Sequence, residues 1–198
     1  VKRLETCSNC RATAIAAIST RGVARVFTAG QQTIRVLLGS DLDVRAGELT
    51  YLVGESGSGK TTLISIMCGI LWPTEGEVRL FGTDIYRLSD SDLVDFRLRN
   101  VGFIFQQFGL VGRMTCMENV LVGALGQLRG PRLGIRSYPK ALRQEALEHL
   151  DRVGLATQVF QRADTLSGGQ MQRVAIARAL VRDTPIYLFD EPFASQDR

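Results

Sequence analysis

The chain has 198 residues, of which 45% are hydrophobic and 22% charged, with a formal net charge of +4. This composition excludes an intrinsically disordered chain and a collagen-like one. The longest stretch without a charge runs from Thr61 to Thr74, which is too short to span a bilayer, so we expect no part of the chain to cross a membrane. The positive charge is modest and scattered, and by itself it selects no anionic partner.

Strand patterns dominate the first part of the chain. Residues 1–22 form a leader without a clear role, and the domain is predicted to begin at Val23. Alternating or short apolar runs predict strands at residues 23–28, 34–38 and 41–44. A continuous apolar run at residues 49–53 is typical of a strand that is buried on both faces.

Helices and strands then alternate. Apolar runs predict strands at residues 77–81, 101–105 and 186–189. Apolar periodicity and cap residues predict helices at residues 61–72, from Ser89 onward, at 115–128, at 139–153 and after Gly168. This order indicates an α/β fold, and the consecutive helices indicate a helical subdomain inserted at about residues 107–165.

The cysteine pattern indicates reduced thiols. Cys7 and Cys10 form a single CxxC without a second pair at zinc spacing, so we expect no metal there. Cys68 and Cys116 lie in apolar surroundings, where we expect buried thiols. Reduced cysteines and the lack of a convincing secretion signal favour the cytoplasm. His149 receives no functional role.

A glycine-rich loop carries the strongest chemical signal. Residues 54–61 read GESGSGKT and match the phosphate-loop pattern GxxxxGK[ST], between a predicted strand and a predicted helix. Glycines let backbone N–H groups point at phosphate oxygens, and the helix N-terminus adds positive charge. The sequence therefore predicts an ATP site in which Lys60 bridges the β- and γ-phosphates and Thr61 binds Mg²⁺. The predicted phosphate-binding residues are Gly54, Ser56, Gly57, Ser58, Gly59, Lys60, Thr61 and Thr62.

Two carboxylates follow the last predicted strand. Asp190 and Glu191 come directly after the apolar residues 186–189. A strand end of this kind can deliver Asp190 to Mg²⁺ or to a water on it. Glu191 would then orient and deprotonate the attacking water, which is a role worth about 10²–10⁴ in rate.

A second glycine-bearing helix start lies at residues 166–170, which read LSGGQ. It offers a hydroxyl and free N–H groups, so it is a second anion cradle in one polypeptide. From about Val23 to Arg198 the chain resembles the ATPase subunits of ABC transporters, and this implies a P-loop α/β fold with a mostly parallel core sheet, an N-terminal antiparallel β subdomain and an inserted helical subdomain. That resemblance implies that two subunits pair head to tail, each ATP lying between the phosphate loop of one subunit and the LSGGQ of the other.

The resemblance also implies roles for single residues. Ser167, Gly168, Gly169 and Gln170 form the signature, whose Ser167 and Gly169 would contact the γ-phosphate of the partner's nucleotide. Phe27 matches the aromatic residue that stacks on adenine, although a strand core residue is the alternative. Gln106 matches the Gln loop, which senses Mg²⁺ and water, and Asp197 matches the D-loop aspartate. The implied catalytic residues are Glu191, Gln106 and Lys60.

Two stretches point to different subfamilies. Residues 54–106 look like the ATPases of lipoprotein-releasing and macrolide-type exporters, whereas residues 119–170 look more like the ATPase of phosphonate importers. The importer resemblance implies transmembrane permease subunits and a substrate-binding protein as partners, and a place at the cytoplasmic face of the membrane. A soluble ABC protein that binds nucleic acid is the less favoured class, since neither tandem cassettes nor a long coiled-coil insertion is present.

The end of the sequence departs from the family pattern. Family members carry a switch histidine, at the end of another parallel strand, a few tens of residues after the glutamate that corresponds to Glu191. Only seven residues follow Glu191 here, so the resemblance implies a cassette that is truncated at its C-terminus. A non-catalytic ABC fragment therefore stays open as an alternative to an active ATPase.

Overall fold

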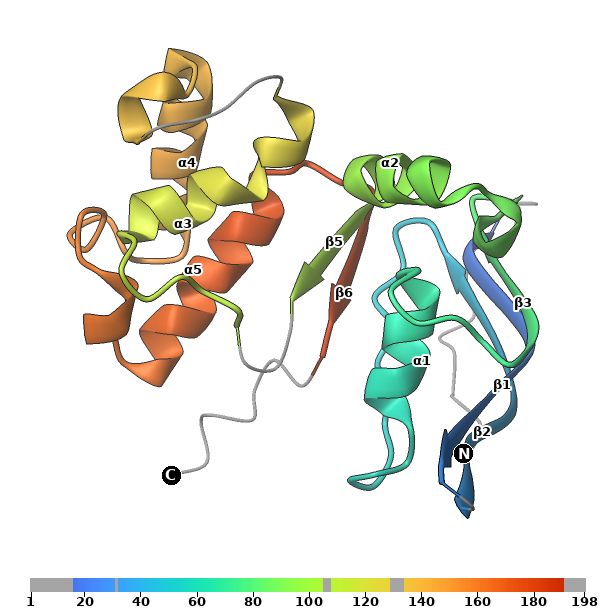
Figure 1. The fold of residues 1–198 in the computed structure, drawn as a ribbon. Helices are drawn as coiled ribbons and strands as arrows, with labels where there is room; N and C mark the ends of the chain where they lie inside the picture. Colours follow the sequence, from blue (N-terminus) through green and yellow to red (C-terminus); the bar gives the residue numbers. More distant parts are fainter. Residues whose placement is uncertain (1–15, 31, 105–107, 129–133, 191–198) are drawn as a thin grey trace. The chain divides into compact units, whose positions relative to one another are not determined.

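The computed structural model describes residues 16–30, 32–104, 108–128 and 134–190 (Figure 1). The chain divides into two compact units, Val1–Asp95 and Phe96–Arg198, and each is described by itself. Within the described residues, none of the helices combines the length and the apolar character that a membrane span requires.

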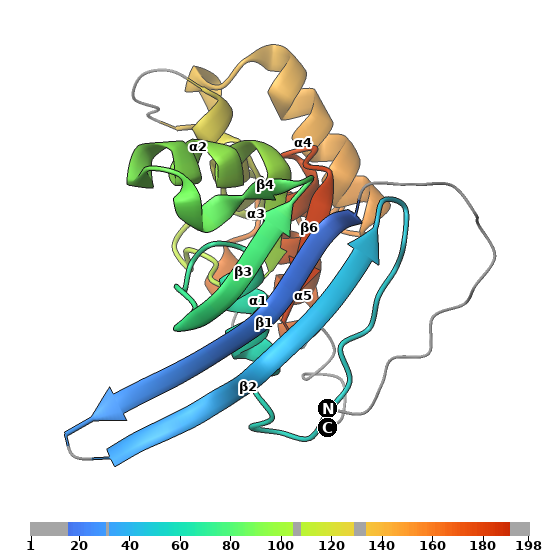
Figure 2. The ribbon, with the colours of Figure 1, turned by 90° about the vertical axis from the view of Figure 1, so that its right-hand side faces the viewer.

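An antiparallel sheet of four strands forms most of the first unit, in the order β2-β1-β3-β4. Its strands are β1 (Ala16–Ala29), β2 (Gln32–Arg45), β3 (Glu75–Leu80) and β4 (Thr83–Asp84). Figure 2 shows β1 and β2 as one long hairpin. The predicted strands at 23–28, 34–38, 41–44 and 77–81 are thus confirmed. β1 begins at Ala16, however, so it includes residues that the sequence assigned to a leader.

Helix α1 (Lys60–Met67) lies in the same unit, with Leu63, Ile64, Ile66 and Met67 buried. It ends about five residues earlier than the predicted helix at 61–72. Gly69 adopts a left-handed conformation with φ 71°, and the N–H groups of Ile70 and Leu71 both bond to the carbonyl of Ser65. This turn stops the helix before Trp72 although the apolar run continues.

The prediction of a buried strand at residues 49–53 is wrong for this structure. None of the described strands pairs with these residues, and the side chains of Leu49, Tyr51 and Val53 are 77%, 65% and 78% exposed. An apolar run becomes a buried strand only when neighbouring strands bond to its backbone on both sides. Among the described residues that condition is not met.

The second unit contains two parallel strands, β5 (Val101–Ile104) and β6 (Ile186–Phe189), paired in register. Both strands were predicted from the sequence, although the prediction for β5 extended one residue further, to residue 105. Its helices are α3 (Cys116–Gly123), α4 (Lys140–Arg152) and α5 (Gly168–Leu180). Helix α2 (Asp90–Asn100) precedes β5. The remaining described elements are four short 3₁₀ helices. One lies in the first unit, η1 (Ile85–Arg87), and three lie in the second, η2 (Leu125–Gln127), η3 (Ile135–Ser137) and η4 (Ala163–Thr165).

Helices α3, α4 and α5 share one hydrophobic core. Val120, Leu121, Leu150, Leu155 and Val174 are fully buried in it. The predicted helix starts are confirmed, since Thr115 caps α3 and Ser167 caps α5 through their side chains. The helix predicted at 115–128 continues only to Gly123 as an α-helix.

Two of the four cysteines, Cys68 and Cys116, lie within the described residues, and the prediction for them can be checked. Cys68 and Cys116 are buried thiols outside any disulfide, as expected, and burial raises the pKa of the Cys116 thiol. Cys7 and Cys10 lie outside the described residues. In the part of the chain that the structure describes, no group of three or more His, Cys, Asp and Glu side chains could hold a metal ion.

Candidate nucleotide-binding site

The phosphate loop turns sharply into α1. The N–H of Ser58 bonds to the carbonyl of Glu55 at 3.2 Å, and Gly57 and Gly59 have φ values of 80° and 92°. A Cβ at Gly59 would stand 2.9 Å from Cδ2 of Leu37 and 3.0 Å from a backbone oxygen. Both the left-handed conformation and the lack of space require glycine there.

Lys60 closes this loop from inside the first turn of α1. Its Nζ donates hydrogen bonds to the carbonyl oxygens of Gly54 and Glu55, each at 2.8 Å. The ammonium group is therefore held beside the backbone of the loop, next to the helix N-terminus. No acidic residue lies in the first turn of α1, and its N-cap, Gly59, has no side chain to cap it. Positive charge thus accumulates at one exposed point, which suits an anion.

Thr61 and Thr62 follow Lys60 on the same helix. Thr61 is exposed and Thr62 is half-buried, whereas the next two residues are buried in the unit. The amphipathic pattern of α1 thus directs its start to solvent and its later residues to the core. The predicted phosphate-binding residues 54–62 are all described, and the structure brings them together around one loop and one helix start.

Phe27 lies on β1 of the same unit and is 38% exposed, which speaks against its being a core residue. The guanidinium of Arg25 lies over its ring, 4.7 Å from the centroid, and Nη1 of Arg25 donates to the carbonyl of Trp72 at 2.8 Å. The sequence analysis did not predict this contact. Arg25 and Phe27 are two residues apart on a strand, so their side chains share a face, and this spacing could have indicated the contact.

The signature residues start α5 in the second unit. The hydroxyl of Ser167 accepts a hydrogen bond from the N–H of Gln170 at 3.3 Å, and the side chain of Gln170 accepts one from the N–H of Ser167 at 2.9 Å. This is a capping box, which the pattern S-x-x-Q could have predicted. Gln170 therefore helps to shape the turn that presents Gly168 and Gly169, which are half-buried.

Asp190 follows β6 directly, as the sequence predicts. It is 4% exposed, and its N–H bonds to the carbonyl of Ile104 at 3.0 Å, which extends the pairing of β6 with β5 by one residue. A carboxylate is thus placed at the carboxyl end of two parallel strands, where ligands of α/β sheets bind.

Three predicted site residues, Gln106, Glu191 and Asp197, lie outside the described residues. His149, to which the sequence assigned no role, lies on α4 with its Nε2 3.8 Å from a carboxylate oxygen of Glu145.

A glycine-rich loop at a helix start, an aspartate at the end of a parallel strand and a serine-capped glycine turn characterise this chain as an α/β protein of the P-loop type. The family model described as "ABC transporter" matches residues 37–194, and the chain belongs to that family. It is 54% identical over 154 residues to the phosphonates import ATP-binding protein PhnC of Frankia casuarinae, covering 78% of this chain and 60% of that protein.

Other relatives agree with this family but differ in their names. The phosphate-import ATP-binding protein PhnC of Mycolicibacterium smegmatis is 54% identical over 156 residues, which are 79% of this chain and 59% of that protein. The chain therefore matches only about 60% of the length of these curated relatives.

Solved structures show the same fold. The dimeric structure of MJ0796, a bacterial ABC transporter cassette, has a TM-score of 0.81 at 36% identity and covers 91% of this chain and 76% of that one. A second structure of MJ0796, described as a post-hydrolysis dimer with ADP and Pi, has a TM-score of 0.80. The fold class predicted from the sequence, that of an ABC ATPase, is thus confirmed.

Proposed function

We propose that this protein binds and hydrolyses ATP and that it energises an ABC transporter. The observation that carries the proposal is the phosphate loop. Gly59 starts α1 in a left-handed conformation, Lys60 is held against the backbone of the loop, and the start of the helix is exposed. Such a cradle binds the polyphosphate of a nucleotide through backbone N–H groups and the Lys60 ammonium.

The residues present also suit Mg²⁺. A hydroxyl, an amide oxygen and a carboxylate are the hard oxygen ligands that this ion prefers, and the chain offers them as Thr61, Gln106 and Asp190. Thr61 is exposed at the start of α1, and Asp190 stands at a strand end. Bound Mg²⁺ would supply charge neutralisation on the phosphates. Glu191 would accept a proton from the attacking water and pass it on, while Phe27 would stack against adenine.

The signature makes sense in a head-to-tail pair of subunits. Ser167 is exposed and Gly169 is half-buried at the start of α5, so they can meet the γ-phosphate of a nucleotide bound to another subunit, and Asp197 would face that second site. The dimeric cassettes of MJ0796 support such a pair.

Import of a phosphorus oxyanion is the transport function that the relatives support. Relatives at 54% identity are named as import proteins for phosphonates and for phosphate, which favours import over the lipoprotein-releasing and macrolide-type exporters. The proposed partners are transmembrane permease subunits and a substrate-binding protein, and the proposed location is the cytoplasmic face of the membrane. We favour phosphonate as the cargo.

Two measurements test this function. ATP hydrolysis by the protein is compared with that of Glu191→Gln, which should keep nucleotide affinity and slow hydrolysis at least a hundredfold. Equal rates would remove Glu191 from the mechanism. Uptake of labelled methylphosphonate and of labelled phosphate is then compared in cells with and without an intact gene. If only the uptake of phosphate is lost, phosphate rather than phosphonate is the cargo. If the uptake of both compounds is unchanged, the proposal of import is contradicted.

A further inference from the structure

Arginines at the signature helix bind backbone carbonyls of three neighbouring segments. Arg173 donates to the carbonyls of residues 153 and 154 at the end of α4, and Arg182 donates to those of residues 97 and 98 at the end of α2. Arg178, between them, donates to the carbonyls of Phe108 and Gly109, the latter at 2.7 Å. Arg173 and Arg182 bind the C-terminal ends of helices, where the helix dipole favours a cation.

Arg178 differs because its target is not a helix. Phe108 and Gly109 both adopt the left-handed conformation, with φ values of 57° and 54°. For phenylalanine this conformation is uncommon and costs about 1 kcal/mol or more, so it persists only where the surroundings impose it. The two hydrogen bonds to Arg178 and the packing of Phe108 against Ala175 and Ala179 provide that constraint.

Partial burial adds to the cost of breaking this contact. Desolvation lowers the pKa of the Arg178 guanidinium, and no ion pair joins Arg178 to a carboxylate among the described residues. A partly desolvated cation without an ion pair is costly unless its donors are satisfied. Arg178 and Phe108 are half-buried and Gly109 is exposed, so the carbonyls of Phe108 and Gly109 satisfy the guanidinium at a place that water reaches only in part.

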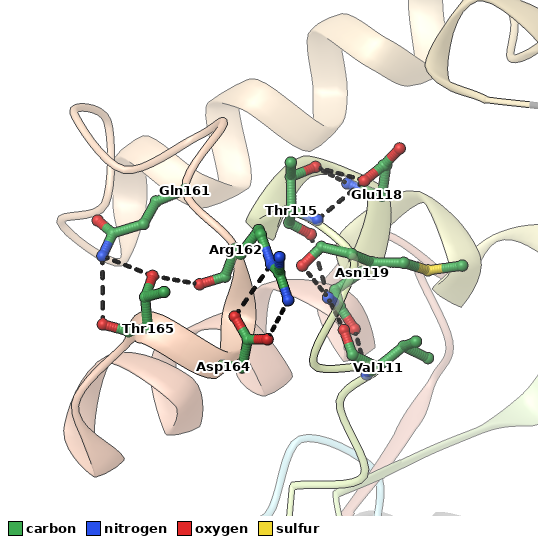
Figure 3. Close-up of polar contacts among 9 residues, drawn as sticks. Val111, Thr115, Glu118, Asn119, Gln161, Arg162, Asp164 and Thr165 are labelled. Carbon is green, nitrogen blue, oxygen red and sulfur yellow. Dashed lines mark hydrogen bonds and ion pairs between the residues drawn. The ribbon is translucent and has the colours of Figure 1, made fainter.

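The chain that follows Gly109 is tied to the segment before the signature. Cys116 and Met117 donate from their N–H groups to the carbonyls of Gln161 and Val159 at 2.9 and 3.0 Å, and a bridge joins Thr115 to Arg162. Figure 3 shows the polar contacts on both sides of this junction, with Asn119 bonded to Val111 and Arg162 paired with Asp164. Residues 108–117 are therefore tied to α5 at one end and to residues 159–162, which precede the signature, at the other.

We propose that Arg178 is a positioning residue that fixes the backbone of Phe108 and Gly109 relative to the helix that begins at Gly168. The inference rests on the proposed ATPase function, in which Gln106 and the signature both act on bound nucleotide. Gln106 precedes Phe108 by only two residues in the sequence, so we expect a change at the anchor to reach it through the chain. In this proposal Arg178 acts only through the segment that it holds.

Arg178→Met and Arg182→Met form a matched pair for the test. Each replaces a guanidinium that donates to two backbone carbonyls, and the two residues are one helical turn apart in sequence. Both variants should lose stability. Only Arg178→Met should speed hydrogen exchange of the amides at residues 108–112, by tenfold or more. Because this measurement does not depend on ATP hydrolysis, it tests whether Arg178 holds residues 108 and 109 even if the proposed function is wrong.

Steady-state kinetics test the functional half. For Arg178→Met we expect kcat for ATP hydrolysis to fall at least tenfold with KM within twofold, because the phosphate loop is intact, whereas Arg182→Met should keep kcat within twofold. Arg178→Lys, which keeps the charge and one donor direction, should recover part of kcat, and it replaces the methionine variant if that variant does not fold. Unchanged exchange at 108–112, or equal kcat in the two methionine variants, would overturn the proposal. A wild-type protein without any ATPase activity would instead contradict the proposed function.

Discussion

The carbonyl oxygen of Arg178 lies 2.3 Å from the point where a Cβ atom would stand at Gly123. Helices α3 and α5 therefore approach so closely at this point that only glycine fits. Gly123→Ala should lower the free energy of unfolding by about 1–3 kcal/mol, because one helix must shift and repack. Urea unfolding followed by circular dichroism measures the loss. A variant as stable as the wild type would show that the two helices can separate there without cost.

Gly169 is the opposite case. Its backbone is not in the left-handed region, and a Cβ there would meet nothing within 4 Å, so the fold does not require glycine. Gly169→Ala should leave stability unchanged or raise it by up to about 1 kcal/mol, since alanine is the better helix former. We nevertheless expect ATP hydrolysis to fall at least tenfold, because a methyl group would stand where the γ-phosphate of the partner's nucleotide is proposed to lie. Full activity would remove this contact from the proposed dimer.

Lys60→Met tests the phosphate cradle. It removes a charge-assisted interaction worth about 1.5–3 kcal/mol, so affinity for ATP should fall roughly 10- to 150-fold. Lys140→Met is the matched control, because Lys140 is an exposed lysine at the first position of α4. Isothermal titration with ATP measures both. Equal affinity in the two variants would contradict the assignment of Lys60.

The exposed ring of Phe27 allows a test that distinguishes binding of the adenine base from binding of the phosphates. Stacking on a base contributes about 1–3 kcal/mol, so Phe27→Ala should weaken ATP binding roughly 5- to 150-fold, while Phe27→Tyr should bind normally. Tripolyphosphate, which has no base, should bind wild type and Phe27→Ala alike. Phe160→Ala provides the control, since Phe160 is 72% exposed. If tripolyphosphate binding falls as much as ATP binding, Phe27 acts through the fold.

Local signals in the sequence predicted much of this structure. Ser89 bonds to the N–H of Asp92 at the start of α2, and Gly154 ends α4 with φ 71°, as the cap patterns indicate. The phosphate loop was predictable for the same reason, because its glycines and lysine act within eight residues of chain. Cap residues and turn glycines depend on neighbours in sequence, so a sequence pattern suffices for them.

Features that depend on distant partners were not predictable. Burial of Leu49 and Val53 requires paired strands on both sides, which a hydrophobic run cannot guarantee. The anchor at Arg178 joins residues 69 and 70 positions apart, and an arginine in a helix gives no sign of the carbonyls that it will meet. Side-chain contacts across such distances follow from tertiary packing rather than from local pattern.

Asn119 provides the last test, since it organises the turn between Gly109 and α3. It is 1% exposed, its Oδ1 accepts from the N–H of Val111 at 2.8 Å, and its Nδ2 lies within 3.3 Å of the carbonyls of Val111, Met114 and Thr115. Asn119→Leu keeps the volume but leaves these backbone groups without their partner, at about 1–3 kcal/mol for each group that stays buried. We therefore expect a loss of at least about 3 kcal/mol in the free energy of unfolding.

Asn100→Leu is the matched control for this variant, because Asn100 is a half-buried asparagine whose Nδ2 donates to the carbonyl of Phe96 at 2.8 Å. It should cost about 1 kcal/mol, the net value of a typical hydrogen bond. Thermal unfolding of both variants in parallel measures the difference. Similar losses in the two would mean that water replaces Asn119 in the turn, and that residues 111–115 are held by their bonds to residues 159–164 alone.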